Sequence, residues 1–200
     1  LDSTTIVNMI NNAFTLNSGC QIGDDIDGIG NDDSRSGWSV DLNETGDIIV
    51  IGAPREESNI PINGSVRTGS VRVLKNISGQ WTPLGGPIFG PTSDTDGFGY
   101  SVSINKNGNI IAVGGPKQDL YNQNGGLVQL FEFNGLSWTQ IGQDLYGQTD
   151  EQMSSVDLND SGNIILIGRR DGNTGEGIYS IFEYNSQNWI QIGTDIIDIS

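Results

Sequence analysis

The stretch DGFGYSVSINKNGNIIAVGGP, residues 96–116, decides the fold, because the chain repeats its pattern three times. After Phe98-Gly99, small polar and apolar residues alternate over 101–104, as they do in a strand with one buried face. An asparagine-rich turn with Gly108 follows, and glycine readily takes the positive φ that such hairpins need. The run 110–113, after Asn109, is then apolar on both faces, which predicts a strand buried on both sides.

The same order of features recurs at residues 37–52 and 154–168. A tryptophan-led phrase closes each unit: WTPLGGPIFG from Trp81, WTQIGQDLYG from Trp138 and WIQIGTDIID from Trp189. A related phrase without tryptophan, CQIGDDIDG, occupies residues 20–28. Self-similarity that recurs at intervals of tens of residues is typical of repeat architectures. The chain therefore contains three repeat units and a half unit before them.

Each unit predicts four short antiparallel strands, which is typical of a β-propeller blade. We expect an all-β, β-propeller-type protein in which four-stranded antiparallel blades succeed one another along the chain. The expected blades cover about residues 37–90, 98–147 and 154–197; residues 20–28 form the last strand of a preceding unit, and 1–19 a degenerate strand of that unit. A β-solenoid or sandwich is the rival, but solenoid repeats are usually shorter and lack a tryptophan-led fourth strand.

Three units are too few for a closed ring, because propellers typically have four to eight blades. The sequence therefore predicts a partial propeller. Either the remainder of a longer chain or a second copy, in a homo-oligomer, would complete it.

Composition excludes several classes of function. With 25 acidic and 9 basic residues the net charge is −16, so binding to nucleic acid or to anionic lipid is disfavoured. No apolar run approaches the roughly 18 residues of a membrane span, so membrane insertion is not expected. There is no histidine, and Cys20 is the single cysteine, which removes the commonest general base and any cysteine-rich zinc site. We predict a protein that is not an enzyme.

The string Asp96-Gly97-Phe98-Gly99 with the later Gly114-Gly115-Pro116 resembles the FG-GAP repeats of integrin α-subunit propellers and of many bacterial surface proteins. Gly52-Ala53-Pro54 in the first unit is a literal GAP. The third unit departs most from the FG-GAP pattern, with Met153-Ser154 at the FG position and Arg169-Arg170 in place of Ala-Pro. The resemblance covers roughly residues 20–195 and implies a propeller that binds its ligand outside the cell.

The resemblance also raises the question of calcium, since many FG-GAP blades carry a calcium loop between their first two strands. Such a loop needs several hard oxygen ligands with anionic charge. The candidates are Asp41, Asn43 and Asp47 in the first unit and Asp157 and Asn159 in the third. A plain hairpin turn explains the same residues without metal, and it is the preferred interpretation. No cofactor is otherwise expected.

Loops that join the fourth strand of one unit to the first of the next share a rim with those between second and third strands. Variable loops on a fixed scaffold commonly carry specificity, so this rim is the predicted site for a protein or glycan ligand, against the alternative of plain solvated charge. The candidate residues are Asp32, Asp33, Arg55, Glu56, Asp94, Asp96, Asp150, Glu151, Arg169 and Arg170. Glycosylation sequons lie at Asn43, Asn63, Asn76 and Asn159.

From these features we expect a non-enzymatic, extracellular or cell-surface module for adhesion or protein binding. One alternative is a structural component that self-assembles in a surface layer or filament. The other is an accessory propeller of a larger secreted hydrolase, since some FG-GAP propellers accompany hydrolase domains.

Overall fold

A computed structural model describes residues 21–29, 33–58, 66–91, 97–116, 125–148 and 151–198 of the chain. The predicted degenerate strand at residues 1–19 lies outside these ranges. The described residues form strands, turns and bends without any helix, and so they offer no helix that could cross a membrane.

The strands form three main antiparallel sheets, and each follows the chain as a simple meander. The first contains β1 (Ser39–Leu42), β2 (Ile48–Ala53), β5 (Ser70–Ile77) and β6 (Gln80–Pro83). The second contains β8 (Ser101–Ile104), β9 (Ile110–Gly115), β10 (Leu127–Phe133) and β11 (Trp138–Gln140). The third contains β13 (Glu151–Leu158), β14 (Ile164–Asp171), β15 (Gly177–Tyr184) and β16 (Trp189–Gln191).

Shorter strands extend the three main sheets and form a separate hairpin. A fifth strand pairs with the third long strand of each sheet: β7 (Ile88–Phe89), β12 (Leu145–Tyr146) and β17 (Ile196–Asp198). The loop after β2 holds a small hairpin of β3 (Glu57–Ser58) and β4 (Val66–Arg67). The predicted fold class, all-β with propeller-type four-stranded antiparallel units, is confirmed.

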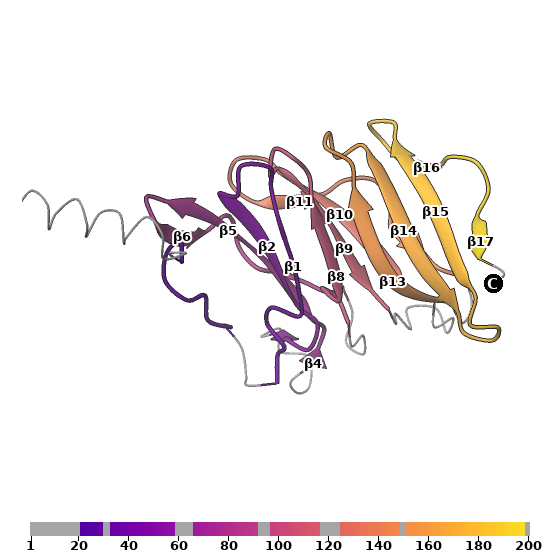
Figure 1. The fold of residues 1–200 in the computed structure, drawn as a ribbon, viewed down its shortest axis with the longest axis horizontal. Helices are drawn as coiled ribbons and strands as arrows, with labels where there is room; N and C mark the ends of the chain where they lie inside the picture. The colour runs from indigo at the N-terminus through magenta and orange to yellow at the C-terminus, as the bar shows by residue number, and fades with distance from the viewer. Residues whose placement is uncertain are drawn as a thin grey trace, which may run out of the picture.

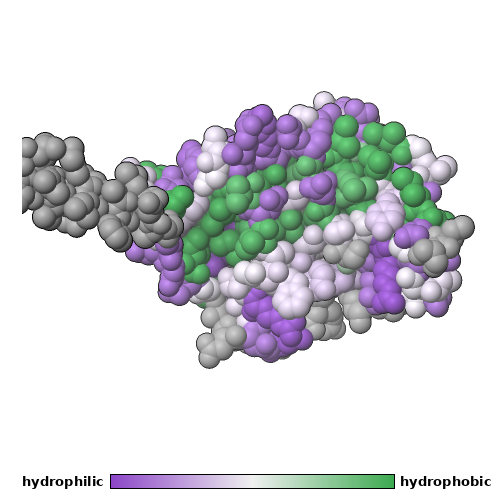
Figure 2. Space-filling view, viewed as in Figure 1, coloured by the Kyte–Doolittle hydropathy of each residue, from purple (hydrophilic) through white to green (hydrophobic). Residues whose placement is uncertain are grey.

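Figure 1 shows the three sheets side by side in chain order along the long axis of the molecule. In the same view, Figure 2 shows a band of hydrophobic surface that runs across the molecule along this axis. One buried cluster joins the first and second sheets and includes Val50, Val71, Val102 and Ile111. A second cluster joins the second and third sheets and includes Val128, Leu130, Val156 and Ile165. Each sheet is thin, and its apolar residues are buried by the neighbouring sheet, which explains why the second strands are apolar on both faces.

Small residues at the inner strands allow this close stacking. Ser39, Ser101 and Ser155 each pair across their hairpin with a glycine. A Cβ on one of these glycines, Gly52, would lie 2.0 Å from the backbone oxygen of Gly99 in the next unit. Ser39 donates a hydrogen bond to that same oxygen at 2.8 Å. Glycine and serine here let the backbones of consecutive units meet directly.

A hydrogen bond from each unit's tryptophan also joins it to the unit before. The indole Nε1 of Trp138 donates to the carbonyl oxygen of Leu84 at 2.7 Å, and that of Trp81 donates to Ile22 at 2.9 Å. The glycine after each acceptor, Gly85 or Gly23, has positive φ and lies against the indole. Residues 21–29 form bends rather than a strand, yet Ile22 takes the place that Leu84 takes one unit later.

Candidate functional site

The turns between first and second strands are built around a single asparagine in each unit. The Oδ1 of Asn43 accepts the backbone N–H of Ile48 at 2.9 Å, so its Nδ2 points into the loop. That Nδ2 donates to Thr45 and, at 2.9 Å, to Asp47. The Thr45 hydroxyl also donates to Asp47. This bond, then the one from Asn43 and the nearby charge of Lys75, hold the pKa of the Asp47 carboxyl below its usual value.

The third unit repeats the arrangement. Asn159 accepts the backbone N–H groups of Asn163 and Ile164, and its Nδ2 donates to the side chain of Asn163 at 3.0 Å. A donor N–H₂ therefore occupies the centre of both loops, where a calcium ion would need oxygen ligands. No group of three or more histidine, cysteine or acidic residues suited to a metal exists within the described ranges. The residues of these loops do not fit calcium.

Asp41, the remaining calcium candidate of the first unit, takes part in a contact between units. Its Oδ2 accepts the backbone N–H of Ile104 in the second sheet at 2.8 Å. Ser103 stands at the equivalent position one unit later, and its hydroxyl accepts the N–H of Leu158 at 3.1 Å. Asp157, the third member of this series, is exposed.

The sequons are poorly placed for a glycan. The Nδ2 atoms of Asn43 and Asn159 are engaged inside their turns, and that of Asn76 is buried. Asn63 lies outside the described residues.

In the first unit, the loops of the rim predicted to bind a ligand lie next to each other. Arg55 donates its backbone N–H to Ser34 at 3.1 Å, which ties the loop after β2 to the loop before β1. Asp33 forms ion pairs with Arg55 at 3.5 Å and with Arg67 at 3.1 Å. These pairs are exposed and contribute little stability. Four of the candidates, Asp32, Asp94, Asp96 and Asp150, lie outside the described residues.

Two further rim candidates form a buried ion pair instead of an exposed binding surface. Arg169 and Glu151 are each 7% exposed, and Nη1 of the arginine lies 2.8 Å from Oε2 of the glutamate. Nη2 of Arg169 lies 3.1 Å from Asp195 and also contacts the hydroxyl of Ser180. This cluster replaces the small residues that follow Gly52 and Gly114 in the other units. Arg170, next along the chain, is exposed.

Glu56, also predicted for the rim, lies under it. The residue is 5% exposed, and its Oε2 has no hydrogen-bond partner within the described part of the chain. Burial raises the pKa of this carboxyl, an effect that the charge of Arg72 and a hydrogen bond from Ser34 only partly offset. Glu56 is therefore not presented to a ligand at the surface.

An exposed group of side chains, which we define as the aromatic platform, consists of Arg35, Trp38 and Tyr100. The two rings lie 5.4 Å apart between centroids, and the Arg35 guanidinium lies 5.1 Å from the Trp38 ring. Arg35 has φ of +56°, a conformation that non-glycine residues rarely adopt. Trp38 is 48% and Tyr100 38% exposed, although Tyr100 has a sheet on either side. The aromatic residue just before the first strand thus faces solvent even in the middle unit.

Neither Trp38 nor Tyr100 was among the site residues predicted from the sequence. The available signal was the shared phrase Gly-aromatic-Ser-Val at residues 37–40 and 99–102. Two aromatic residues at one repeat position indicate a shared surface across neighbouring units.

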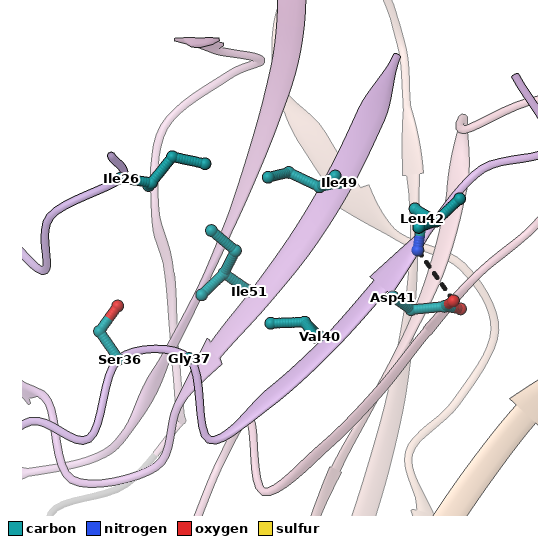
Figure 3. Close-up of a pocket in the computed structure, with 8 residues that line it drawn as sticks. All are labelled: Ile26, Ser36, Gly37, Val40, Asp41, Leu42, Ile49 and Ile51. Atoms are coloured by element: carbon teal, nitrogen blue, oxygen red, sulfur yellow. Dashed lines mark hydrogen bonds between the residues drawn. The ribbon is translucent and has the colours of Figure 1, made fainter. Parts of the chain in front are cut away.

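A pocket of about 450 Å³ lies on the outer face of the first sheet. Figure 3 shows Ile26 opposite Ile51, Val40 and Ile49, while the carboxylate of Asp41 points away from them. The lining is mostly apolar, with Ser36 and Asp41 as its polar side chains, whereas sites for small substrates usually present several convergent polar groups. This hollow is an uncovered part of the outer face of the first sheet.

No family model and no curated protein matches the chain. Similar solved structures include one of two prolyl endopeptidases, with a TM-score of 0.47 and 8% identity over 79% of this chain and 20% of that one. The β-propeller domain of the Trilobed protease from Pyrococcus furiosus has a TM-score of 0.45 and 11% identity, over 80% and 41%. A hypothetical selenium-binding protein from Sulfolobus tokodaii gives 0.46 and 9%, over 78% and 40%. The chain spans less than two thirds of the length of each of these structures.

Proposed function

We propose that the chain is a non-enzymatic binding module of an extracellular or cell-surface protein, and that it binds a protein ligand through the aromatic platform. The observation that carries this proposal is the exposure of Trp38 and Tyr100 side by side with Arg35 above the indole. Tryptophan, tyrosine and arginine are the residues most enriched among the energetic anchors of protein interfaces.

The local geometry supports an anchoring role. The turn from Arg35 to Trp38, closed by a 3.0 Å backbone hydrogen bond, holds both side chains before β1 begins. Tyr100 enters β8 in the same way, after a 2.8 Å bond from its N–H to Gly97. Because the platform is built on strand starts, it loses little conformational freedom on binding.

The non-enzymatic part rests on the residues that could carry chemistry. The sequence has no histidine. Among the rim residues that the structure describes, the buried carboxylates are Glu151, paired with Arg169, and Glu56, which lies beneath the loops. The extracellular or surface location rests on the FG-GAP resemblance alone.

The test is binding of the labelled chain to a printed array of purified extracellular-matrix proteins, beside a printed glycan array. We expect binding to at least one protein, weakened at least tenfold by Trp38→Ala, since truncation of an interface anchor costs about 2 kcal/mol or more. Leu136→Ala is the matched control, because Leu136 is 84% exposed but lies in the turn between β10 and β11, away from the platform.

Circular dichroism should show that both variants stay folded, since Leu136 is largely exposed and Trp38 is about half-exposed. Binding to glycans alone would replace the protein ligand by a sugar. Failure to bind either array, or protein binding that Trp38→Ala leaves intact, would contradict the proposal.

A further inference from the structure

The outer face of the third sheet, formed by Leu166, Tyr179, Ile181 and Ile196, is the feature that the proposed function leaves unexplained. The first, second and fourth of these residues are 41%, 39% and 58% exposed. By strand register they correspond to Ala112, Val128, Leu130 and Leu145 in the second sheet. Those four residues are buried against the third sheet.

This face also repeats the space beside a glycine that the indole of the next unit fills in the first two units. A Cβ on Gly142 would lie 2.5 Å from the Trp189 ring, and one on Gly85 would lie 3.0 Å from Trp138. The corresponding glycine of the third unit, Gly193, has a similar positive φ, +73°, but a Cβ there would meet no described atom within 4 Å. The preceding residue, Ile192, corresponds to the acceptors Ile141 and Leu84, and it is 46% exposed.

Polar backbone contacts between units follow the same regular series. Glu44 donates its N–H to the backbone oxygen of Lys106 at 3.3 Å, and Lys106 donates its N–H to Asp160 at 3.1 Å. The next donor in this series is the N–H of Asp160 itself. Asp157, which follows Asp41 and Ser103 as an acceptor, lies on the same exposed edge.

We propose that the outer face of the third sheet is a docking surface for a fourth repeat unit of the same type, carrying a tryptophan at the start of its fourth strand. The indole would lie on Gly193 and donate to the carbonyl oxygen of Ile192. Apolar residues of its first two strands would cover Leu166, Tyr179 and Ile196. Continuity with two interfaces already formed inside the chain specifies both the register and the chemistry of this partner.

A second copy of the chain fits this surface less well. Its first unit presents the face that would dock, but the tryptophan of that unit, Trp81, already donates to Ile22 and lies against Gly23. Docking of a copy would require residues 21–29 to leave that place. A unit other than the three described here meets no such competition.

The experiment extends the full chain by a second copy of residues 150–200 after Ser200, which keeps the spacing found between Trp138 and Trp189. Hydrogen exchange of the Asp160 amide is followed by NMR in the parent and extended chains. We expect exchange at Asp160 to slow at least tenfold on extension, together with burial of the added indole.

Gly193→Asn in the extended chain should return the Asp160 exchange rate to its parent value, because the added side chain fills the place of the indole. Asparagine tolerates positive φ, so the backbone is preserved. Gly135→Asn is the matched control, since Gly135 has φ of +96° and also faces open space. That variant should leave the slowed exchange unchanged.

Three results would overturn the proposal. One is an appended unit that stays unfolded beside an intact parent, because the same sequence folds in the third unit. Another is an effect of Gly193→Asn no larger than that of Gly135→Asn. The third is dimerisation of the unextended chain that Gly193→Asn abolishes, which would make a second copy the occupant.

Discussion

The indole Nε1 of Trp189 donates a hydrogen bond to the carbonyl oxygen of Ile141, in the preceding unit, at 3.1 Å. The tryptophan is 2% exposed and packs against Tyr184 with ring centroids 5.0 Å apart. The same bond recurs at Trp138 and Trp81. It joins consecutive units at the end of the sheets opposite the aromatic platform.

Trp189→Phe tests the hydrogen bond separately from the packing. Phenylalanine keeps a ring but lacks the N–H, so the free energy of unfolding should fall by about 1 kcal/mol, plus a smaller packing loss. Trp189→Ala should cost about 3–5 kcal/mol because it also leaves a cavity. Urea denaturation measures both, with Trp38→Phe, at an exposed site, as the control expected near zero. Equal stability of Trp189→Phe and Trp38→Phe would refute a role for the indole donor.

The turn asparagines should matter for stability and should not respond to calcium. Asn105, 1% exposed, accepts the N–H groups of Asn109 and Ile110, so Asn105→Ala should cost about 1–3 kcal/mol through unpaired donors. Addition of calcium to about 1 mM, where weak extracellular sites are occupied, should leave Tm unchanged. A rise in Tm with calcium that Asp47→Asn removes would show that the loop does bind the ion.

The Arg169–Glu151 pair offers a matched comparison between neighbouring arginines. Arg169→Met leaves two acidic groups without their buried partner and should cost about 3–5 kcal/mol. Arg170→Met removes the adjacent exposed charge and should change stability by less than about 0.5 kcal/mol. Glu151→Gln combined with Arg169→Met should recover part of the loss. Similar unfolding free energies for the two single variants would mean that the buried pair does not form.

Glu56 makes the stability depend on pH. Because burial raises the pKa of its folded-state carboxyl above the ordinary value, the folded state holds the proton more tightly than the unfolded state between the two pKa values. The destabilisation from the charged form is therefore present at neutral pH and is relieved as the pH falls through the folded-state pKa.

Glu56→Gln removes this group, and the difference between variant and wild type isolates it from all other titrations. The variant should be the more stable of the two at neutral pH, and its advantage should shrink on acidification. Denaturation curves of both proteins over a series of pH values measure the difference. An advantage that stays constant or grows toward low pH would contradict a raised pKa.

The repeat made the fold predictable, since strand alternation at 101–104, turn glycines and buried second strands are all local signals. The contacts between stacked sheets could not be predicted, because the partner of Asp41 is a backbone N–H 63 positions away. From the sequence, Asp41 was only a calcium candidate, raised by the FG-GAP resemblance. Burial of Arg169 with Glu151 was missed for a similar reason. A charged residue in a loop sequence is normally exposed, and only the substitution of arginine for a small residue marked the site.

The central claim is that three units are joined in series through their tryptophans. The chain has four tryptophans, and exchange of their indole N–H protons can be followed separately by NMR. The account predicts slow exchange for Trp81, Trp138 and Trp189, with Trp189 slowest, and faster exchange for Trp38, which is 48% exposed. Four similar exchange rates, or a Trp38 proton as protected as that of Trp189, would contradict it.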